Sequence, residues 1–149
     1  MSLYTRFVTA ALLPLHERIK GHSTMRIYRE LEASQWLSPL ELQALQLQRL
    51  RAFLSDIGAH VPHYRALFTD LDFNPAAMES LAELAQLPLT GKPEIRLHTD
   101  RLKAEDARVL QRYNTGGSSG EPLIFYQGSG RVSHDVAAKR RATRWWGVD

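Results

Sequence analysis

The chain contains no cysteine, so it cannot form a disulfide framework, a thiolate metal site or a thiol nucleophile. A reducing compartment fits this absence, and we expect a cytoplasmic protein. Long hydrophobic runs are missing too. The longest apolar stretch, 7–15, is interrupted by Thr9 and Pro14 and falls far short of the ~20 residues of a membrane span. No small-residue cleavage site follows it, so we expect neither a membrane span nor a secretion signal.

An excess of charge of one sign is also lacking. The 149 residues include 19 Lys plus Arg against 16 Asp plus Glu, and the basic residues are spread along the chain. This balance argues against nucleic acid as a partner. Hydrophobic residues make up 44% and charged residues 23%, which is typical of a globular chain forming one domain or part of one.

Glycine is scarce in the first three quarters of the chain and frequent in the last. Only Gly21, Gly58 and Gly91 precede residue 113, out of 9 glycines in all. The hydrophobic periodicity of the first part is helical, whereas the last part contains glycine-rich turns and a strand-like run. We therefore expect a helical N-terminal region over 1–112 and a differently folded part over 113–149, and an α+β fold class.

The clearest helix start is Ser38-Pro39-Leu40-Glu41. Ser38 can cap the helix, Pro39 loses no hydrogen bond at the first position, and Glu41 can reach back to the cap. Gly58 is expected to end this helix. Its apolar stripe, at spacings of three and four, comprises Leu47, Leu50, Phe53, Leu54 and Ile57.

Two shorter helices are expected after it. Asn74-Pro75 predicts a capped helix that continues to residue 85 and stops before Pro88. Residues 91–99 predict another, with Pro93 and Glu94 in its first turn. Most aromatic side chains of this region are assigned to packing among the helices: Tyr28, Trp36, Phe53, Tyr64, Phe68 and Phe73.

The last part predicts a β-hairpin followed by a helix. A small-residue loop over 113–122 precedes the strand-like run 123–126, residues 127–130 form a turn, and 131–146 return to helical composition ahead of Gly147. Basic and aromatic residues near the end of this helix are expected to serve packing, with the tryptophans left as an exposed apolar patch. They are Lys139, Arg140, Arg141, Arg144, Trp145 and Trp146.

The loop 115–120 is where local composition favours chemistry. Glycines allow consecutive amides to point at one anion, and Thr115, Ser118 and Ser119 add hydroxyl donors, which together suit the oxygens of a polyphosphate. A plain flexible hairpin turn explains the same composition and stays open as an alternative.

Other catalytic and metal motifs fit poorly. The pattern G-x-S-x-G would make Ser118 a hydrolase nucleophile, but no helix start follows it. The loop has no lysine, which excludes a Walker-type loop. His60 and His63 lack a third ligand at metal-site spacing. We therefore expect no catalytic residue and no metal ligand of this chain's own.

The segment 113–126, YNTGGSSGEPLIFY, resembles the phosphate loop of adenylate-forming acyl ligases, which is rich in Thr, Ser and Gly and ends in Gly-x-Pro. It is most similar to the phenylacetate-CoA ligase family, and within it to the capsular-polysaccharide-associated CapK-like branch. The resemblance extends over nearly the whole chain, although only the loop is a functional signature. Its other segments are 14–18, 31–51, 60–65, 87–89 and 144–147.

This resemblance implies a two-step reaction, in which a carboxylate attacks the α-phosphate of MgATP and coenzyme A then takes the acyl group. The loop would hold the leaving pyrophosphate in line and offset its growing charge. Many relatives have a lysine just after the proline of the loop, whereas this chain has Leu123. The implied phosphate-binding residues are Thr115, Gly116, Gly117, Ser118, Ser119, Gly120, Glu121 and Pro122.

The resemblance also implies a longer protein. Its adenine-binding segment, ribose-binding acid and catalytic lysine have no counterpart here, so we expect an N-terminal fragment that makes no acyl-adenylate unaided, and a separate chain as one source of the missing domains. The acid substrate is not identified, because its pocket is implied to lie mostly in segments absent here. The alternative is a non-catalytic interaction module or truncated remnant whose loop is a plain turn.

Overall fold

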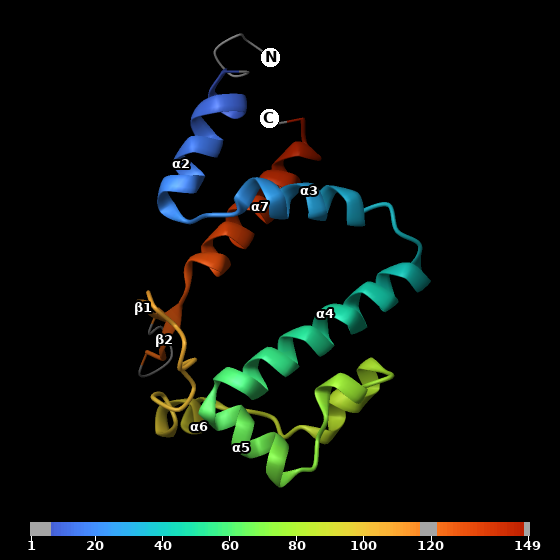
Figure 1. Ribbon diagram of the computed structural model, residues 1–149, viewed down its shortest axis with the longest axis vertical. Helices are drawn as coiled ribbons and strands as arrows, with labels where there is room; N and C mark the ends of the chain where they lie inside the picture. Colours follow the sequence, from blue (N-terminus) through green and yellow to red (C-terminus); the bar gives the residue numbers. More distant parts are fainter. Residues whose placement is uncertain (1–6, 117–121, 148–149) are drawn as a thin grey trace. The chain divides into compact units, whose positions relative to one another are not determined.

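The computed structural model describes residues 7–116 and 122–147. It consists mainly of helices, with one two-stranded antiparallel sheet among the described residues, which confirms the α+β class (Figure 1). The chain forms two compact units. The terminal unit combines residues 1–37 and 127–149, and the central unit spans 38–126.

The terminal unit is helical. Its elements are the π-helix η1 (Val8–Leu12) and the α-helices α2 (Leu13–Lys20), α3 (Thr24–Ser34) and α7 (Ser129–Arg144). Helix α7 begins at Ser129, so the expected turn over 127–130 is wrong in its second half: Gly128 adopts extended backbone and serves as the N-cap. Gly147 follows the helix with φ +75°, a left-handed conformation suited to glycine, which confirms its expected place at the end.

Helices α3 and α7 pack against each other largely through polar side chains. Ser133 is 1% exposed, accepts a hydrogen bond from the Ser23 amide at 3.2 Å and lies 3.1 Å from His22 Nδ1. Arg141 donates to the Leu31 carbonyl at 3.3 Å. Arg144 donates to the Tyr28 hydroxyl at 2.8 Å and to the Glu32 carboxylate at 2.7 Å, while Arg140 lies over the Tyr28 ring. The packing role expected for these arginines is confirmed.

The tryptophans of the terminal unit are exposed. Trp145 donates from its indole to the Gln35 side chain at 3.0 Å and still remains 64% exposed, and Trp146 is 86% exposed. The exposure expected for Trp145 and Trp146 is therefore confirmed. Trp36 is 84% exposed, so its assignment to helix packing is wrong: it lies beyond Gln35, the residue that caps the end of α3.

The central unit is built on one long helix. Its elements are α4 (Pro39–His60), α5 (Pro62–Asp70), the 3₁₀ helices η2 (Pro75–Ala77) and η3 (Leu81–Gln86), α6 (Lys92–Leu97) and β1 (Gln111–Asn114), with β2 (Ile124–Gln127) completing the hairpin. The buried core is formed by Leu54, Phe68, Phe73 and Met78, where α4 meets α5 and η2.

The start of α4 is the predicted capping box. The Ser38 amide donates to the Glu41 carboxylate at 2.8 Å, and the Glu41 amide donates back to Ser38 Oγ at 3.4 Å. Hydrogen bonds from Ser38 lower the pKa of Glu41. Of the predicted stripe, Leu54 is buried, and Leu47, Leu50 and Ile57 pack against the core; Phe53 is 59% exposed, so its expected burial is wrong.

Gly58 does not end α4, contrary to expectation. The helix continues to His60 and is capped by Val61, directly before Pro62 opens α5. A Cβ at position 58 would lie 2.9 Å from Cδ2 of Phe68, which is closer than carbon atoms tolerate. Glycine is therefore needed for the close approach of the α5 aromatic ring rather than for helix termination.

The segment after Asn74 does not form the single helix that the sequence predicts. Asn74 caps as predicted, accepting from the Ala76 amide at 3.1 Å. The turn then stops, because Ser80 and Glu83 form a second capping box that starts η3. Two short 3₁₀ helices replace the predicted helix, whereas α6 confirms the one predicted over 91–99.

Candidate functional site

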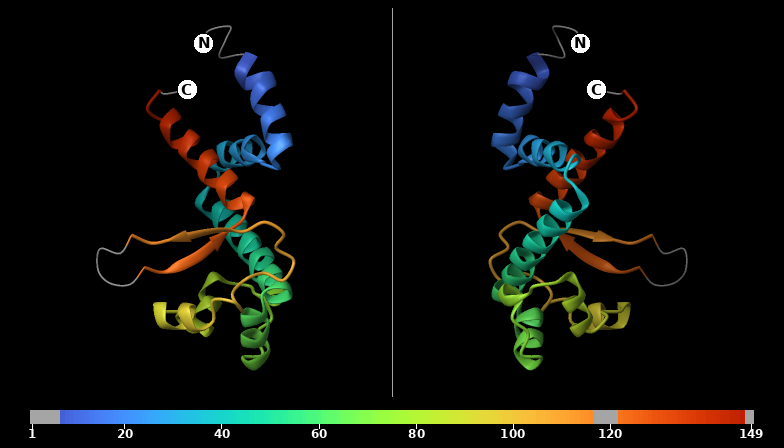
Figure 2. Two further views of the ribbon diagram at one scale, coloured as in Figure 1. Left: turned by 90° about the vertical axis from the view of Figure 1, so that its left-hand side faces the viewer. Right: turned by 90° about the vertical axis from the view of Figure 1, so that its right-hand side faces the viewer.

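The hairpin has a defined register at the base of the predicted loop. The Thr115 amide donates to the Leu123 carbonyl at 3.0 Å, and the Leu123 amide donates to Thr115 Oγ1 at 2.9 Å. In the same register Tyr113 lies opposite Phe125, and their rings stack with centroids 5.9 Å apart. The two strands thus lie side by side and bring both ends of the loop together (Figure 2).

The structure refines what Thr115 can offer to an anion. Its amide is already used by the Leu123 carbonyl, so the expectation that consecutive loop amides bind phosphate does not extend to Thr115. Its hydroxyl oxygen accepts from the Leu123 amide, and an accepting hydroxyl keeps its proton for donation. Thr115 can therefore contribute an O–H group.

Gly116 and Pro122 lie at the two ends of the loop and are both exposed. A Cβ added at Gly116 would meet nothing within 4 Å, so the space around it is open to a ligand. Five predicted phosphate-binding residues fall outside the described residues: Gly117, Ser118, Ser119, Gly120 and Glu121. Their assignment remains a prediction.

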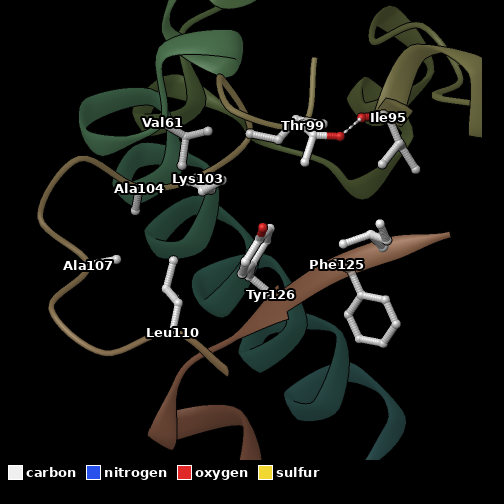
Figure 3. Close-up of a pocket in the computed structure, with 11 residues that line it drawn as sticks. Val61, Ile95, Thr99, Lys103, Ala104, Ala107, Leu110, Phe125 and Tyr126 are labelled. Carbon is white, nitrogen blue, oxygen red and sulfur yellow. Dashed lines mark hydrogen bonds between the residues drawn. The ribbon is translucent and has the colours of Figure 1, made fainter. Parts of the chain in front are cut away.

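A cavity lies on one face of β2, inside the central unit. Its volume is about 260 Å³, and its wall is largely apolar. Ile124 and Tyr126 of β2 line it together with Ile95 and Leu102, and Figure 3 shows the Phe125 ring on the other side of the strand from Tyr126. Strand β2 therefore connects the predicted loop to an apolar cavity.

Lys103 is the one charged side chain in the wall of this cavity. Its ammonium lies 4.6 Å from the centroid of the Tyr126 ring and 2.8 Å from the Asp100 carboxylate. The hydrogen bond with Asp100 raises the pKa of Lys103 and lowers that of Asp100, so both groups are charged near neutral pH. Sequence reasoning missed Lys103, because no local pattern links it to a strand more than 20 residues away.

The histidines show no metal site. The rings of His63 and His98 have centroids 5.0 Å apart and are tilted by 38° to each other, and burial, His98 and Arg101 lower the pKa of His63. In the parts of the chain that the structure describes, no three His, Asp or Glu side chains gather as metal ligands. Searching the same residues finds no helix with both the length and the apolar character to span a membrane.

Comparison with known proteins supports the resemblance stated above, although no family model matches the chain. The chain is 32% identical over 97 residues to a phenylacetate-coenzyme A ligase from Aromatoleum evansii, covering 64% of this chain and 22% of the relative. It is 31% identical over 86 residues to the Escherichia coli (strain K12) enzyme of the same name, covering 56% and 20%. It is also 25% identical over 119 residues to Protein CapK from Staphylococcus aureus, covering 80% and 26%.

These matches span most of this chain but only 20–26% of the relatives' own length. The predicted resemblance is confirmed: the chain is a relative of the phenylacetate-CoA ligases and of CapK, and it spans about a quarter of their length or less.

Proposed function

We propose that the chain is the ATP-phosphate-binding portion of an AMP-forming carboxylate–CoA ligase. The observation that carries the proposal is the hairpin base, where Thr115 and Leu123 hold the ends of a glycine-rich loop together in a relative of phenylacetate-CoA ligases. A loop that surrounds one polyphosphate needs its two ends close together, and this hairpin base supplies that.

The residues at the loop ends fit a polyphosphate. The Thr115 hydroxyl retains a proton to donate, and the open space at Gly116 lets a ligand approach the backbone closely. Gly117, Ser118, Ser119, Gly120, Glu121 and Pro122 complete the proposed loop. Mg²⁺ would arrive with ATP and offset the phosphate charge. The chain has Leu123 where many relatives have a lysine, so no side chain at this position adds positive charge.

The larger reaction is also part of the proposal. A carboxylic acid and ATP would form an acyl-adenylate, and coenzyme A, which the relatives' name includes, would accept the acyl group. The chain would work in the cytoplasm. The resemblance to the CapK-like branch adds polysaccharide biosynthesis to the proposal as a pathway.

Titration with MgATP, followed by amide resonances, tests phosphate binding. We expect shifts at Thr115, Gly116 and Leu123 with MgATP and with Mg-tripolyphosphate but not with AMP, which lacks the β and γ phosphates. Absence of shifts at these three residues, or equal shifts with AMP, would contradict the proposal.

A pair of matched variants sharpens this test. Thr115→Val removes the proposed donor and should weaken MgATP binding about tenfold, the worth of one hydrogen bond to a charged group. Thr69→Val makes the same chemical change at an exposed threonine whose hydroxyl bonds the Arg65 carbonyl, and it should leave binding unchanged. Equal effects of the two variants would refute a phosphate contact by Thr115.

A non-catalytic interaction module is the second candidate. The exposed side chains of Trp36, Trp145 and Trp146 favour it, because large exposed aromatic residues are frequent in protein interfaces. The MgATP titration separates the two candidates, since a module whose loop is a plain turn binds no polyphosphate there.

A further inference from the structure

Four large apolar side chains at the start of the terminal unit face solvent along one line. Leu12, Leu15 and Ile19 follow one another at spacings of three and four, which places them on one face of α2. The π-helix η1 has hydrogen bonds between residues five apart, so it brings Phe7 into line with Leu12. All four side chains are between 47% and 76% exposed. We call Phe7, Leu12, Leu15 and Ile19 the α2 stripe.

The opposite side of α2 contacts the rest of the terminal unit. The Glu17 carboxylate accepts a hydrogen bond at 3.2 Å from the amide of Met25, in the first turn of α3. Successive residues of an α-helix are rotated by about 100°, so Glu17 lies about 160° around the helix from both Leu15 and Ile19. The contact with α3 therefore holds α2 by one side and leaves the α2 stripe open to an external surface.

The terminal unit is also the basic part of the chain. Residues 1–37 and 127–149 contain 10 Lys plus Arg against 5 Asp plus Glu, whereas residues 38–126 contain 9 against 11. The near balance of the whole chain conceals this difference. Exposed basic residues of α3 and α7 include Arg26, Arg29, Arg131 and Lys139. A surplus of this sign attracts an anionic surface and opposes pairing with a second copy of the same unit.

The combination of an apolar stripe and positive charge identifies the kind of surface. An anionic bilayer offers phosphate headgroups to the basic side chains and an acyl-chain boundary to the apolar ones. Nucleic acid presents phosphates alone and would leave the α2 stripe in water. Helices η1 and α2 contain 5 and 8 residues, short of the ~20 that cross a bilayer, so they can lie along its surface.

We propose that the terminal unit docks on the surface of an anionic lipid bilayer, with the α2 stripe between the headgroups and the positive charge of the unit attracting them. The inference goes beyond the proposed function and does not rest on it, because the phosphate loop belongs to the central unit. Vesicle binding and MgATP binding can therefore fail independently.

Sedimentation of the full chain with lipid vesicles tests the proposal. Vesicles of equal parts phosphatidylglycerol and phosphatidylcholine should bind at least about tenfold more tightly than vesicles of phosphatidylcholine alone. Raising the salt from about 0.1 to 1 M should weaken this binding, because the screening length falls from about 10 to 3 Å. Equal binding to both vesicles, or no binding to the anionic ones at about 1 mM lipid, would overturn the proposal.

Two matched pairs of variants locate the contact. Ile19→Gln should weaken binding to anionic vesicles about tenfold, whereas Leu97→Gln, at a central-unit position that is 78% exposed, should leave it unchanged. Lys139→Gln should weaken binding about fivefold, whereas Lys92→Gln, at an exposed lysine of the central unit, should not. Equal effects within either pair would refute docking through the terminal unit.

A second copy of the chain is the competing occupant of the α2 stripe. Sedimentation equilibrium without lipid should show a monomer for the unsubstituted chain and for Ile19→Gln alike. A dimer that Ile19→Gln dissociates would assign the stripe to self-association and overturn the proposal.

Discussion

The terminal and central units reach a packed state by different chemistry. In the central unit, Leu54, Phe68, Phe73 and Met78 form one contiguous apolar core. In the terminal unit, Leu31 and Ala137 are the buried apolar residues among those described. There, Arg141 and Arg144 of α7 hydrogen-bond to α3, and Ser133 hydrogen-bonds to the Ser23 amide just before α3. Where apolar residues are few, long polar side chains take over both packing and hydrogen bonding.

This difference implies different weaknesses. Loss of a side chain in the central unit leaves a cavity, whereas loss of a polar partner in the terminal unit leaves a buried donor or acceptor unsatisfied. All 3 tryptophans are at least 64% exposed, so their fluorescence would change little on unfolding, and amide resonances are needed to follow each unit by itself.

The largest effect is expected from Phe68→Ala. Phe68 is 6% exposed and contacts Phe73, with ring centroids 5.3 Å apart, so truncation should cost about 3–5 kcal/mol in the free energy of unfolding. Phe53→Ala removes a ring that is 59% exposed and should cost less than about 1 kcal/mol. Denaturant unfolding followed by central-unit amides measures both, and similar costs would argue against the apolar core.

Ser133→Ala should produce the next largest effect, and it should act on the terminal unit. The variant leaves the Ser23 amide without its buried acceptor, which should cost about 1–3 kcal/mol. Ser55→Ala at an exposed helix position is the control and should lose no stability. If the amide resonances of the terminal unit show no earlier unfolding in Ser133→Ala, the polar account of this unit is wrong.

Gly58→Ala tests the close approach of α4 and α5. Alanine gains about 1 kcal/mol in helix propensity, but overpacking against the Phe68 ring should cost about 1–3 kcal/mol, for a net loss of stability. In a Phe68→Leu background the clash is relieved, so the same substitution should become neutral or stabilising. Additive free energies in this double-mutant cycle would contradict a direct contact.

The smallest effect concerns pH and the central unit. Burial, followed by His98 and Arg101, lowers the pKa of His63 below its ordinary 6.5, so the folded state binds the proton less well than the unfolded state. The stability contribution is therefore complete above pH 6.5 and declines as pH falls through the folded pKa. His63→Gln should flatten this decline between about pH 7 and 5, as measured by thermal unfolding; an unchanged profile would contradict the shift.

Prediction from sequence succeeded where the physics is local. The Ser38–Glu41 capping box and the Asn74 cap depend on residues within three positions of one another, so their side-chain chemistry predicts them directly. It failed where a distant residue decided the outcome. Gly58 was assigned to a helix end, since nothing near it indicates the ring of Phe68, ten positions later and on another helix.

The candidate site also has features that a local motif predicts and features that depend on distant residues. Thr115, Gly116 and Pro122 were predicted from a continuous motif, and their positions at the ends of the hairpin loop agree with a strand on either side. The role of the Thr115 amide was not predictable, because it depends on the register that pairs it with Leu123. The cavity was not predictable either, since it combines segments from 61 to 126.

By itself, the sequence determined the caps, the helical and extended segments and the resemblance to ligases, because propensity, capping and motif act over a few neighbouring residues. The tertiary structure alone decided which aromatic rings are buried, which hydrogen-bonding groups of Thr115 stay available and that Lys103 covers the ring of Tyr126. Those outcomes depend on burial and on contacts between residues far apart in the chain, which no local pattern encodes.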